Sequence, residues 1–254
     1  MGTQAVTVWA GQTRVRPADL RGGDYDVASE APPRHKLLIC AAPRSSSKRL
    51  ARLLLGAGLG VPMEYLNGIT VDALSARWGV PRRDYLAHVY ARRSANGVFA
   101  ATLQHNQMDM WPYRNDIADL FERATVVHLT RLDKAAQAAS LAACWLTGHW
   151  GFEEPVSTTE YSARDMKRAA RKALAVIRAE DEHLPRWFDR YGATAVRVTS
   201  DDVNRKDLSV VADLAARLAV DFDRAGAQRM LDLDSGRYRG HETLKSRLLE
   251  YLPS

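Results

Sequence analysis

Cysteine is scarce in this chain, and a hydrophobic run long enough to cross a membrane is absent. The sequence has two cysteines, Cys40 in an apolar stretch and Cys144 in a helical one, so neither a disulfide framework nor a cysteine metal cluster is expected. No apolar run approaches the roughly 20 residues of a transmembrane helix. Residues 1–13 lack the basic start and apolar core of a secretory signal. The composition predicts an unexported protein of the cytoplasm.

The chain has enough apolar residues to form one folded domain, and its net charge suits an anionic ligand. The chain has 254 residues, of which 46% are hydrophobic, and a net charge of +6. A chain of that length and composition can form a hydrophobic core without disulfides or bound metals. The positive net charge suits a polyanionic ligand, although an arginine-rich composition alone gives the same net charge. Residues 1–34 show little periodicity and are interpreted as an N-terminal extension, with one candidate strand over Ala5 to Ala10. Residues 35–254 are expected to form the domain.

Short apolar runs alternate with helical patterns along the domain. Strands are predicted over Leu37 to Ala42, Val98 to Gln104, Ala124 to Leu129 and Ala193 to Val198. Helices are predicted at Ser47 to Leu55, Val71 to Trp78, Arg83 to Arg93, Asp116 to Arg123, Lys134 to Leu146, within Tyr161 to Tyr191, and at Asp207 to Leu218. After Asp221 the pattern mixes helix with a basic loop over Ser235 to Arg239. This alternation predicts an α/β fold, in which a mostly parallel sheet is flanked by helices and binds ligands at the carboxyl ends of its strands.

The turn between the first strand and the first helix carries three hydroxyls and three cations, in the stretch Pro43-Arg44-Ser45-Ser46-Ser47-Lys48-Arg49. A helix N-terminus with such neighbours is an anion site. The nucleotide pattern GxxxxGK[ST] fits only at Lys48, because Ala42 and Ser47 replace its glycines and Arg49 replaces its metal-binding hydroxyl. The turn therefore predicts a phosphorylated donor held without a metal, against the simpler alternative of a solvated basic helix start.

Four segments in this order resemble the bacterial trehalose 2-sulfotransferase family. They are PRSSSKRLARLL, VPMEYLN, NGVFAATLQHNQ and LTRLDKAAQAASLAACW, and the resemblance covers about residues 36–240. It implies a P-loop-like sulfotransferase fold with helical additions. It also implies the donor 3′-phosphoadenosine 5′-phosphosulfate (PAPS), no metal, and a hydroxylated acceptor such as a sugar or glycosylated metabolite. It is compatible with a homodimer, and no nucleic-acid partner is expected.

The resemblance also implies residue roles. The 5′-phosphosulfate would be bound by Arg44, Ser45, Ser46, Ser47, Lys48 and Arg49, with Arg44 also acting in catalysis. Arg131 and Ser140 match the family's 3′-phosphate site, in which an arginine follows a strand and a serine stands nine positions on. An arginine at a helix start and a hydroxyl about two and a half turns along can converge on one phosphate, although Ser140 also suits a small packing position among alanines.

Glu64, in VPMEYLN, takes the place of the family's general base. A carboxylate near the sulfuryl group accepts the proton of the attacking hydroxyl. Its neighbours Tyr65 and Asn67 are predicted acceptor contacts, as is Trp145, whose flat ring suits a sugar but would equally suit the core. His105, at a strand end, is a second catalytic candidate or a structural histidine.

Three positions depart from the family's usual pattern. Ser46 stands where the loop usually has glycine, Lys48 where it has threonine, and Thr102 where the second strand has lysine. Serine restricts a positive φ, while Lys48 can supply the cation that position 102 lacks. Two alternatives to sulfuryl transfer therefore stay open. One is a catalytically silent relative that serves in binding or assembly, and the other is a metal-independent relative of the P-loop kinases.

Overall fold

The computed structural model describes residues 19–27, 32–150, 159–233 and 241–253. Its four strands are β1 His35–Ala41, β2 Val98–Leu103, β3 Ala124–Thr130 and β4 Ala195–Thr199. They form one sheet in the order β2-β1-β3-β4, and all three strand pairs are parallel. The predicted α/β class and the four predicted strands of the domain are confirmed. The candidate strand over Ala5 to Ala10 and the basic loop over Ser235 to Arg239 lie outside the described residues.

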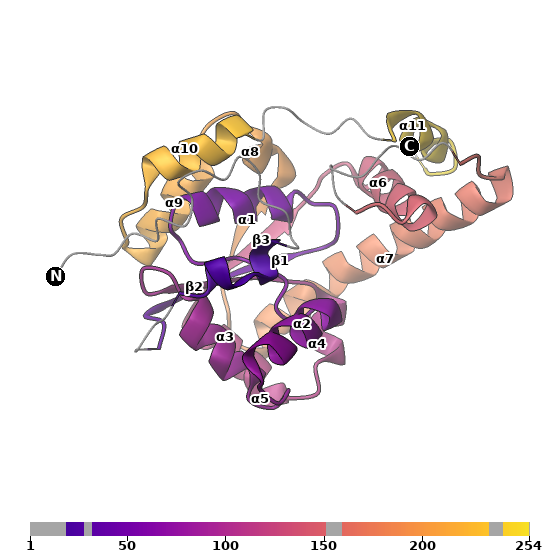
Figure 1. The fold of residues 1–254 in the computed structure, drawn as a ribbon. Coiled ribbons are helices and arrows are strands. Elements are labelled where there is room, and N and C mark those ends of the chain that lie inside the picture. The colour runs from indigo at the N-terminus through magenta and orange to yellow at the C-terminus, as the bar shows by residue number, and fades with distance from the viewer. Residues whose placement is uncertain (1–18, 28–31, 151–158, 234–240, 254) are drawn as a thin grey trace.

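Helices cover both faces of the sheet (Figure 1). On one side lie α1 Ser47–Gly56, α8 Ser200–Asn204, α9 Ser209–Leu218 and α10 Arg224–Leu233. On the other side lie α2 Gly68–Trp78, α3 Tyr85–Arg93, α4 His105–Met110, α5 Arg114–Phe121 and the C-terminal half of α7 Ala163–Arg190. Two short 3-10 helices, Asp19–Arg21 and Gly23–Tyr25, precede the sheet. Because all the strands are parallel, their carboxyl ends lie at one edge of the sheet. Helices α1, α4, α6 Lys134–Thr147 and α8 begin at that edge.

Strand β1 is one of the two central strands of the sheet, because it pairs with β2 on one side and with β3 on the other. Leu37, Leu38, Ile39 and Cys40 are fully buried. Leu38 pairs with Ala101 of β2 on one side and with Val126 of β3 on the other. A strand buried on both faces is apolar throughout rather than alternating, which is why this run was readable from the sequence. The loop that follows β1 therefore starts from a strand buried on both faces.

Helix α1 crosses α10 at two glycines. A Cβ at Gly56 would lie 2.7 Å from the Gly226 carbonyl oxygen, and a Cβ at Gly226 would lie 2.2 Å from the Gly56 carbonyl oxygen. Only residues without side chains allow backbones to approach this closely. The crossing fixes the far end of α1, and with it the direction in which the helix start faces.

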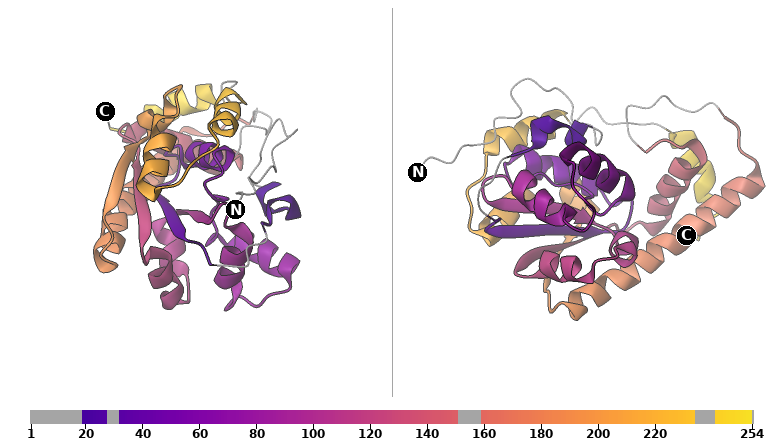
Figure 2. Two further views of the ribbon diagram at one scale, coloured as in Figure 1. Left: turned by 90° about the vertical axis from the view of Figure 1, so that its left-hand side faces the viewer. Right: turned by 60° about the horizontal axis from the view of Figure 1, so that its bottom comes forward.

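A second hydrophobic cluster lies in an arm beside the sheet domain. Helix α6, the N-terminal half of α7 and α11 Glu242–Leu249 pack together there (Figures 1 and 2). The cluster contains Met166, Ala170, Ala173 and Ile177 of α7, whereas Leu184, Trp187 and Phe188 of the same helix belong to the main core. A helix of this length spans about 40 Å, so α7 joins the arm to the sheet domain.

Part of the expected N-terminal extension packs onto the domain. Leu20 and Tyr25 are buried. The fully buried guanidinium of Arg93 donates to the carbonyl oxygen of Leu20 at 2.6 Å and pairs with Asp26, whose Oδ1 is 3.1 Å from Nε. Residues 19–27 thus belong to the folded body.

Candidate active site

The donor loop, defined here as residues 43–49, has two left-handed residues in alternation. Arg44 has φ 65° and Ser46 has φ 72°, so the loop keeps a left-handed turn although serine occupies the position expected for glycine. Ser46 is the N-cap of α1 and makes no side-chain cap bond. The first N–H groups of a helix lack intrahelical partners. Ser45, between the two left-handed residues, is fully buried, and its Oγ has no hydrogen-bond partner among the described residues. The loop therefore presents donors that an anion can satisfy.

Arg44 leaves the loop toward α6. Its Nε donates to Ser140 Oγ at 3.0 Å, and its NH1 donates to the carbonyl oxygen of Trp150 at 3.4 Å. Arg131, which follows β3, lies near the same point. Burial lowers the pKa of Arg131, the carboxylate of Asp133 opposes that shift, and the charge of Arg44 adds to it. The Arg44 guanidinium thus contacts a hydroxyl of α6 and lies close enough to Arg131 for their charges to interact, and two guanidinium groups beside a hydroxyl suit a phosphate.

One face of α6 lies against the donor loop. Gln137 is fully buried, and its Nε2 donates to the carbonyl oxygen of Pro43 at 2.7 Å. Ser140 and Cys144 follow at helical spacing, and Cys144 is close enough to Lys48 to influence its pKa. Asp133 caps the helix by accepting from Ala136 N at 2.8 Å, as predicted. Gln137 was not among the predicted site residues, although it stands three residues before Ser140 and therefore on the same face of the helix.

Lys48 and Glu64 lie close enough for their charges to interact. Burial lowers the pKa of Lys48, the negative charge of Glu64 opposes this shift, and Arg44 adds to it. Glu64 arrives there because the chain reverses after α1. Gly58 and Gly60 have φ 73° and 82°. Beyond them Met63 forms a parallel bridge with Ala101, and its carbonyl oxygen accepts from Thr102 N at 2.9 Å. The segment that carries Glu64 is thus joined to β2 by a single parallel bridge.

The Glu64 carboxylate is held by one of its two oxygens. Oε2 accepts from Asn67 Nδ2 at 3.2 Å and from Gln107 Nε2 at 3.0 Å. Oε1 makes no hydrogen bond to a described residue and is not among the buried atoms. Asn67 also caps α2 by accepting from Ile69 N at 3.1 Å. A carboxylate fixed in this way keeps one oxygen available to a ligand.

A family model for Stf0 sulphotransferases matches residues 36–238. The chain belongs to the Stf0 sulphotransferase family. This is the trehalose 2-sulfotransferase family, so the resemblance read from the four segments is confirmed, as is the sulfotransferase fold. None of the curated proteins compared with the chain matches it.

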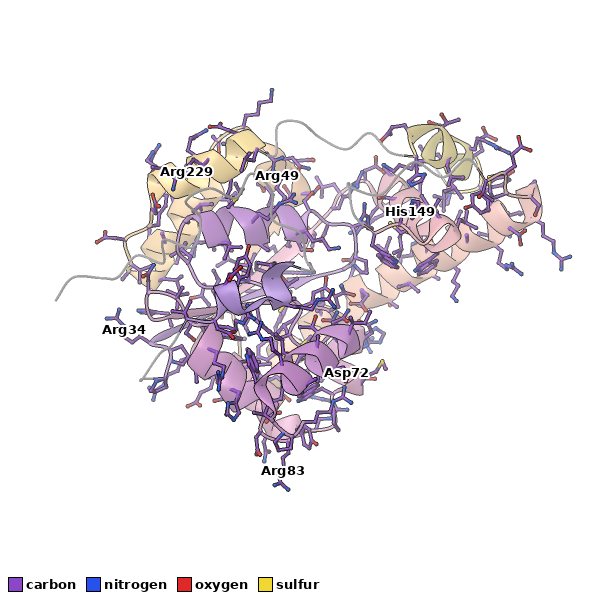
Figure 3. The ribbon with its side chains drawn as sticks, in the orientation of Figure 1. Arg34, Arg49, Asp72, Arg83, His149 and Arg229 are labelled. Carbon is purple, nitrogen blue, oxygen red and sulfur yellow. The ribbon has the colours of Figure 1, made fainter. Side chains whose placement is uncertain are left out.

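Two residues predicted for the sulfotransferase site, Arg49 and Tyr65, direct their side chains to other partners. The buried guanidinium of Arg49 donates to the carbonyl oxygens of Val203 and Arg205, at 2.9 and 3.5 Å, and so joins α1 to the end of α8 (Figure 3). The ring of Tyr65 is in the core, and its hydroxyl donates to the carbonyl oxygen of Val61 at 2.6 Å. Both side chains bind backbone carbonyl oxygens and so stabilise the segments that carry the site.

His105 and Trp145 are both engaged with α7. His105 Nδ1 accepts from Trp187 Nε1 at 2.8 Å, and its ring stacks on His183 with centroids 4.5 Å apart. Burial lowers the pKa of His105, and the charge of His183 adds to the effect. Trp145 lies in the arm, where the ammonium of Lys172 is 5.5 Å from its ring centroid. Neither ring is shown in contact with Glu64.

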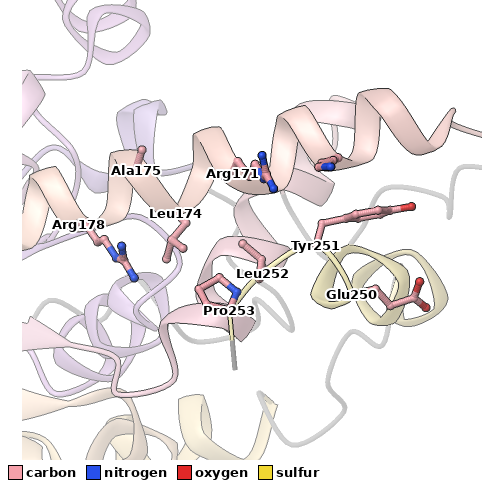
Figure 4. Close-up of a pocket in the computed structure, with 9 residues that line it drawn as sticks. Arg171, Leu174, Ala175, Arg178, Glu250, Tyr251, Leu252 and Pro253 are labelled. Atoms are coloured by element: carbon pink, nitrogen blue, oxygen red, sulfur yellow. The ribbon is translucent and has the colours of Figure 1, made fainter.

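A groove of about 520 Å³ lies in the arm, between α7 and the C-terminal segment 250–253 (Figure 4). Its walls include the cations Lys167, Arg171 and Arg178 and the apolar Leu252. None of its lining residues belongs to the predicted sulfotransferase site. In the part of the chain that the structure describes, no helix is long and apolar enough to span a bilayer, and no three His, Cys, Asp or Glu side chains are grouped so that they could hold a metal ion.

Proposed function

We propose that this sulfotransferase uses PAPS to sulfate a hydroxyl of a carbohydrate or glycosylated metabolite, with Glu64 as the general base. The observation that carries the proposal is the Glu64 carboxylate, which is held on Oε2 alone and interacts with Lys48 of the donor loop. Membership of the trehalose 2-sulfotransferase family supports both the PAPS donor and a sugar acceptor.

The residues at the donor end fit the phosphate groups of PAPS. The Ser45 hydroxyl is buried and unpartnered, at the start of a helix whose first N–H groups are available. Unsatisfied buried polar groups are uncommon in proteins, and a ligand is one reason for them. We assign Ser45, Ser46, Ser47 and Lys48 to the 5′-phosphosulfate. Arg44, Arg131 and Ser140 are assigned to the 3′-phosphate, because Arg44 donates to Ser140 and interacts electrostatically with Arg131.

The residues at the acceptor end have separate roles in the reaction. PAPS supplies a sulfuryl group joined to a phosphate that departs with the electron pair of the broken S–O bond. Glu64 Oε1 accepts the proton of the acceptor hydroxyl, while Asn67 and Gln107 keep the carboxylate from rotating. The partly buried ammonium of Lys48 stabilises negative charge on the departing phosphate, because a cation in a site poorly exposed to water acts strongly. Lys48 thereby replaces the lysine that position 102 lacks.

Calorimetry with adenosine 3′,5′-bisphosphate tests the donor site without knowledge of the acceptor. We expect binding that is the same with magnesium and with a chelator. Absence of binding would overturn the assignment of the donor loop, and binding of ATP in preference to the bisphosphate would favour the kinase alternative.

The role of Glu64 is tested by Glu64→Gln, which keeps shape and hydrogen bonding but cannot take a proton. An acceptor is first found by screening hydroxylated sugars and glycosylated metabolites with sulfur-labelled PAPS. Turnover should then fall by roughly two to four orders of magnitude, with bisphosphate affinity nearly intact. The exposed Glu122 provides the control, since Glu122→Gln should change neither quantity. Near-normal turnover in Glu64→Gln would remove Glu64 from catalysis, and donor binding with no turnover on any acceptor would favour a silent relative.

A further inference from the structure

Helix α4 is capped by a buried carboxylate from a distant helix. It starts directly after β2, and its N-cap residue, Gln104, makes no side-chain cap bond. Glu180 of α7 takes that place: its Oε2 accepts from His105 N at 2.7 Å and its Oε1 accepts from Asn106 N at 3.2 Å. Both carboxylate oxygens are therefore used on two successive N–H groups, so α4 cannot rotate or shift without losing one of these bonds.

The next residue of α4 holds the proposed base. Gln107 is buried, with an exposed fraction of 9%, and its Nε2 donates to Glu64 Oε2 at 3.0 Å. Glu180 thus fixes the two peptide groups immediately before the side chain that orients Glu64. This defines the relay, which runs from Glu180 through the start of α4 to Gln107 and then to Glu64.

A buried carboxylate is a costly cap for so short a helix. Glu180 is 3% exposed and forms no ion pair with a described residue. Burial raises its pKa, whereas the two backbone bonds and the charge of His183 lower it and Asp181 adds to the rise. A serine, threonine, aspartate or asparagine at position 104 would cap α4 locally without burying a charge. The distant cap instead links α4 to α7, the helix that joins the arm to the sheet domain.

We propose that Glu180 is a positioning residue for sulfuryl transfer, acting through α4 and Gln107 to hold the Glu64 carboxylate with Oε1 toward the acceptor. This inference rests on the proposed function of Glu64. Glu180 touches neither donor nor acceptor, and its effect is on the orientation of the base.

The first arm of the test needs no turnover. In Glu180→Gln one carboxylate oxygen becomes an NH₂ group that cannot accept from a peptide N–H, so one of the two caps is lost. We expect faster hydrogen exchange of the amides of residues 105–110, and side-chain amide resonances of Gln107 that move toward those of a free glutamine. Those resonances are assigned by their loss in Gln107→Leu. The control is Glu182→Gln on the exposed face of α7, which should change neither signal. Unchanged exchange in Glu180→Gln would overturn the link between α7 and α4.

The second arm is a double-mutant cycle on the acceptor found above. Glu180→Gln and Gln107→Leu should each lower kcat by about 10- to 100-fold, because small misplacements of a catalytic group have effects of this size. Bisphosphate affinity and acceptor KM should stay within about threefold, since neither residue is assigned to binding. The double variant should be no slower than the slower single variant, as expected for two members of one relay. Additive losses, or equal losses in kcat and in binding, would show a general structural role and overturn the proposal.

The two arms separate failure of the relay from failure of the proposed function. If Glu64→Gln keeps normal turnover while Glu180→Gln releases Gln107, the relay exists but Glu64 is not the base. If Glu64→Gln is inactive and Glu180→Gln leaves kcat unchanged, the base is correct and Glu180 has no positioning role.

Discussion

Arg131→Ala should weaken the binding of a nucleotide that carries a 3′-phosphate more than the binding of one that lacks it. Arg131 lies beside Arg44, whose Nε is 3.0 Å from Ser140 Oγ, and one hydrogen bond from a charged group contributes about 1.5–3 kcal/mol. The charges of Arg44 and Arg131 repel each other in the free protein, so removing one relieves part of that cost. We therefore expect the lower part of this range, a loss of about 10- to 50-fold in affinity for adenosine 3′,5′-bisphosphate.

The comparison ligand is adenosine 5′-monophosphate, which lacks the 3′-phosphate. Calorimetry at one fixed ionic strength should show less than about a threefold loss for this ligand in Arg131→Ala. The exposed Arg83, at the lower edge of Figure 3, serves as the matched control, because Arg83→Ala removes the same charge from a remote surface. Equal losses for the two ligands in Arg131→Ala would refute the assignment of Arg131 to the 3′-phosphate.

Three further predictions concern stability. Ser46→Gly should change the free energy of unfolding by less than about 1 kcal/mol in urea titrations, because the relief of a left-handed serine is offset by the entropy that glycine adds to the unfolded chain and by loss of the hydrogen bond from Ser46 Oγ to Asn204 Oδ1; a loss above about 2 kcal/mol would contradict the strain argument. Asp202→Ala should lower it by about 1 kcal/mol at pH 7. Hydrogen bonds from the Thr199 side chain and backbone lower the pKa of Asp202. The Asp202 carboxylate therefore stabilises the fold above the ordinary aspartate pKa of about 4, and the difference in stability between Asp202→Ala and the unsubstituted chain should vanish as pH falls through the lowered pKa. A stability difference that does not depend on pH would contradict this role of Asp202. Arg93→Met should destabilise by about 3 kcal/mol, since it removes the buried guanidinium that donates to the carbonyl oxygens of Leu20 and Gly22 and pairs with Asp26; thermal unfolding that matches the unsubstituted chain would show that residues 19–27 are not held by Arg93.

The sheet and the donor loop were predictable because their signals are local. An apolar run such as Leu37 to Ala42 specifies a buried strand, and the hydroxyls and cations after it specify an anion site. Helix α4 was missed because its six residues, HNQMDM, have no apolar period and no capping residue at Gln104. Its cap comes from Glu180, which only the folded chain brings near.

Side-chain direction was the part of the site that the sequence could not supply. Arg49 stands among the donor-loop cations, yet it lies one helical position past Lys48 and therefore points about 100° away, toward carbonyl groups of residues 203 and 205. Tyr65 adjoins Glu64, but the chain turns there, with Asn67 N donating to the carbonyl oxygen of Glu64, and the Tyr65 ring enters the core. Gln107 was not singled out, because its meaning depends on a contact with Glu64 across 43 sequence positions.

The central position of β1 has a consequence for how the protein folds. Lys36 at the start of β1 pairs with Ala124 of β3, so the strand that bears the donor loop gains its second neighbour only after a large part of the chain has been synthesised. Parallel pairing between such distant segments is slow, because the entropy of loop closure is lost before the contacts form. Until β3 arrives, one edge of an apolar strand is unpaired and prone to aggregation. Chains interrupted before Thr130 should therefore depend on chaperones to stay in solution.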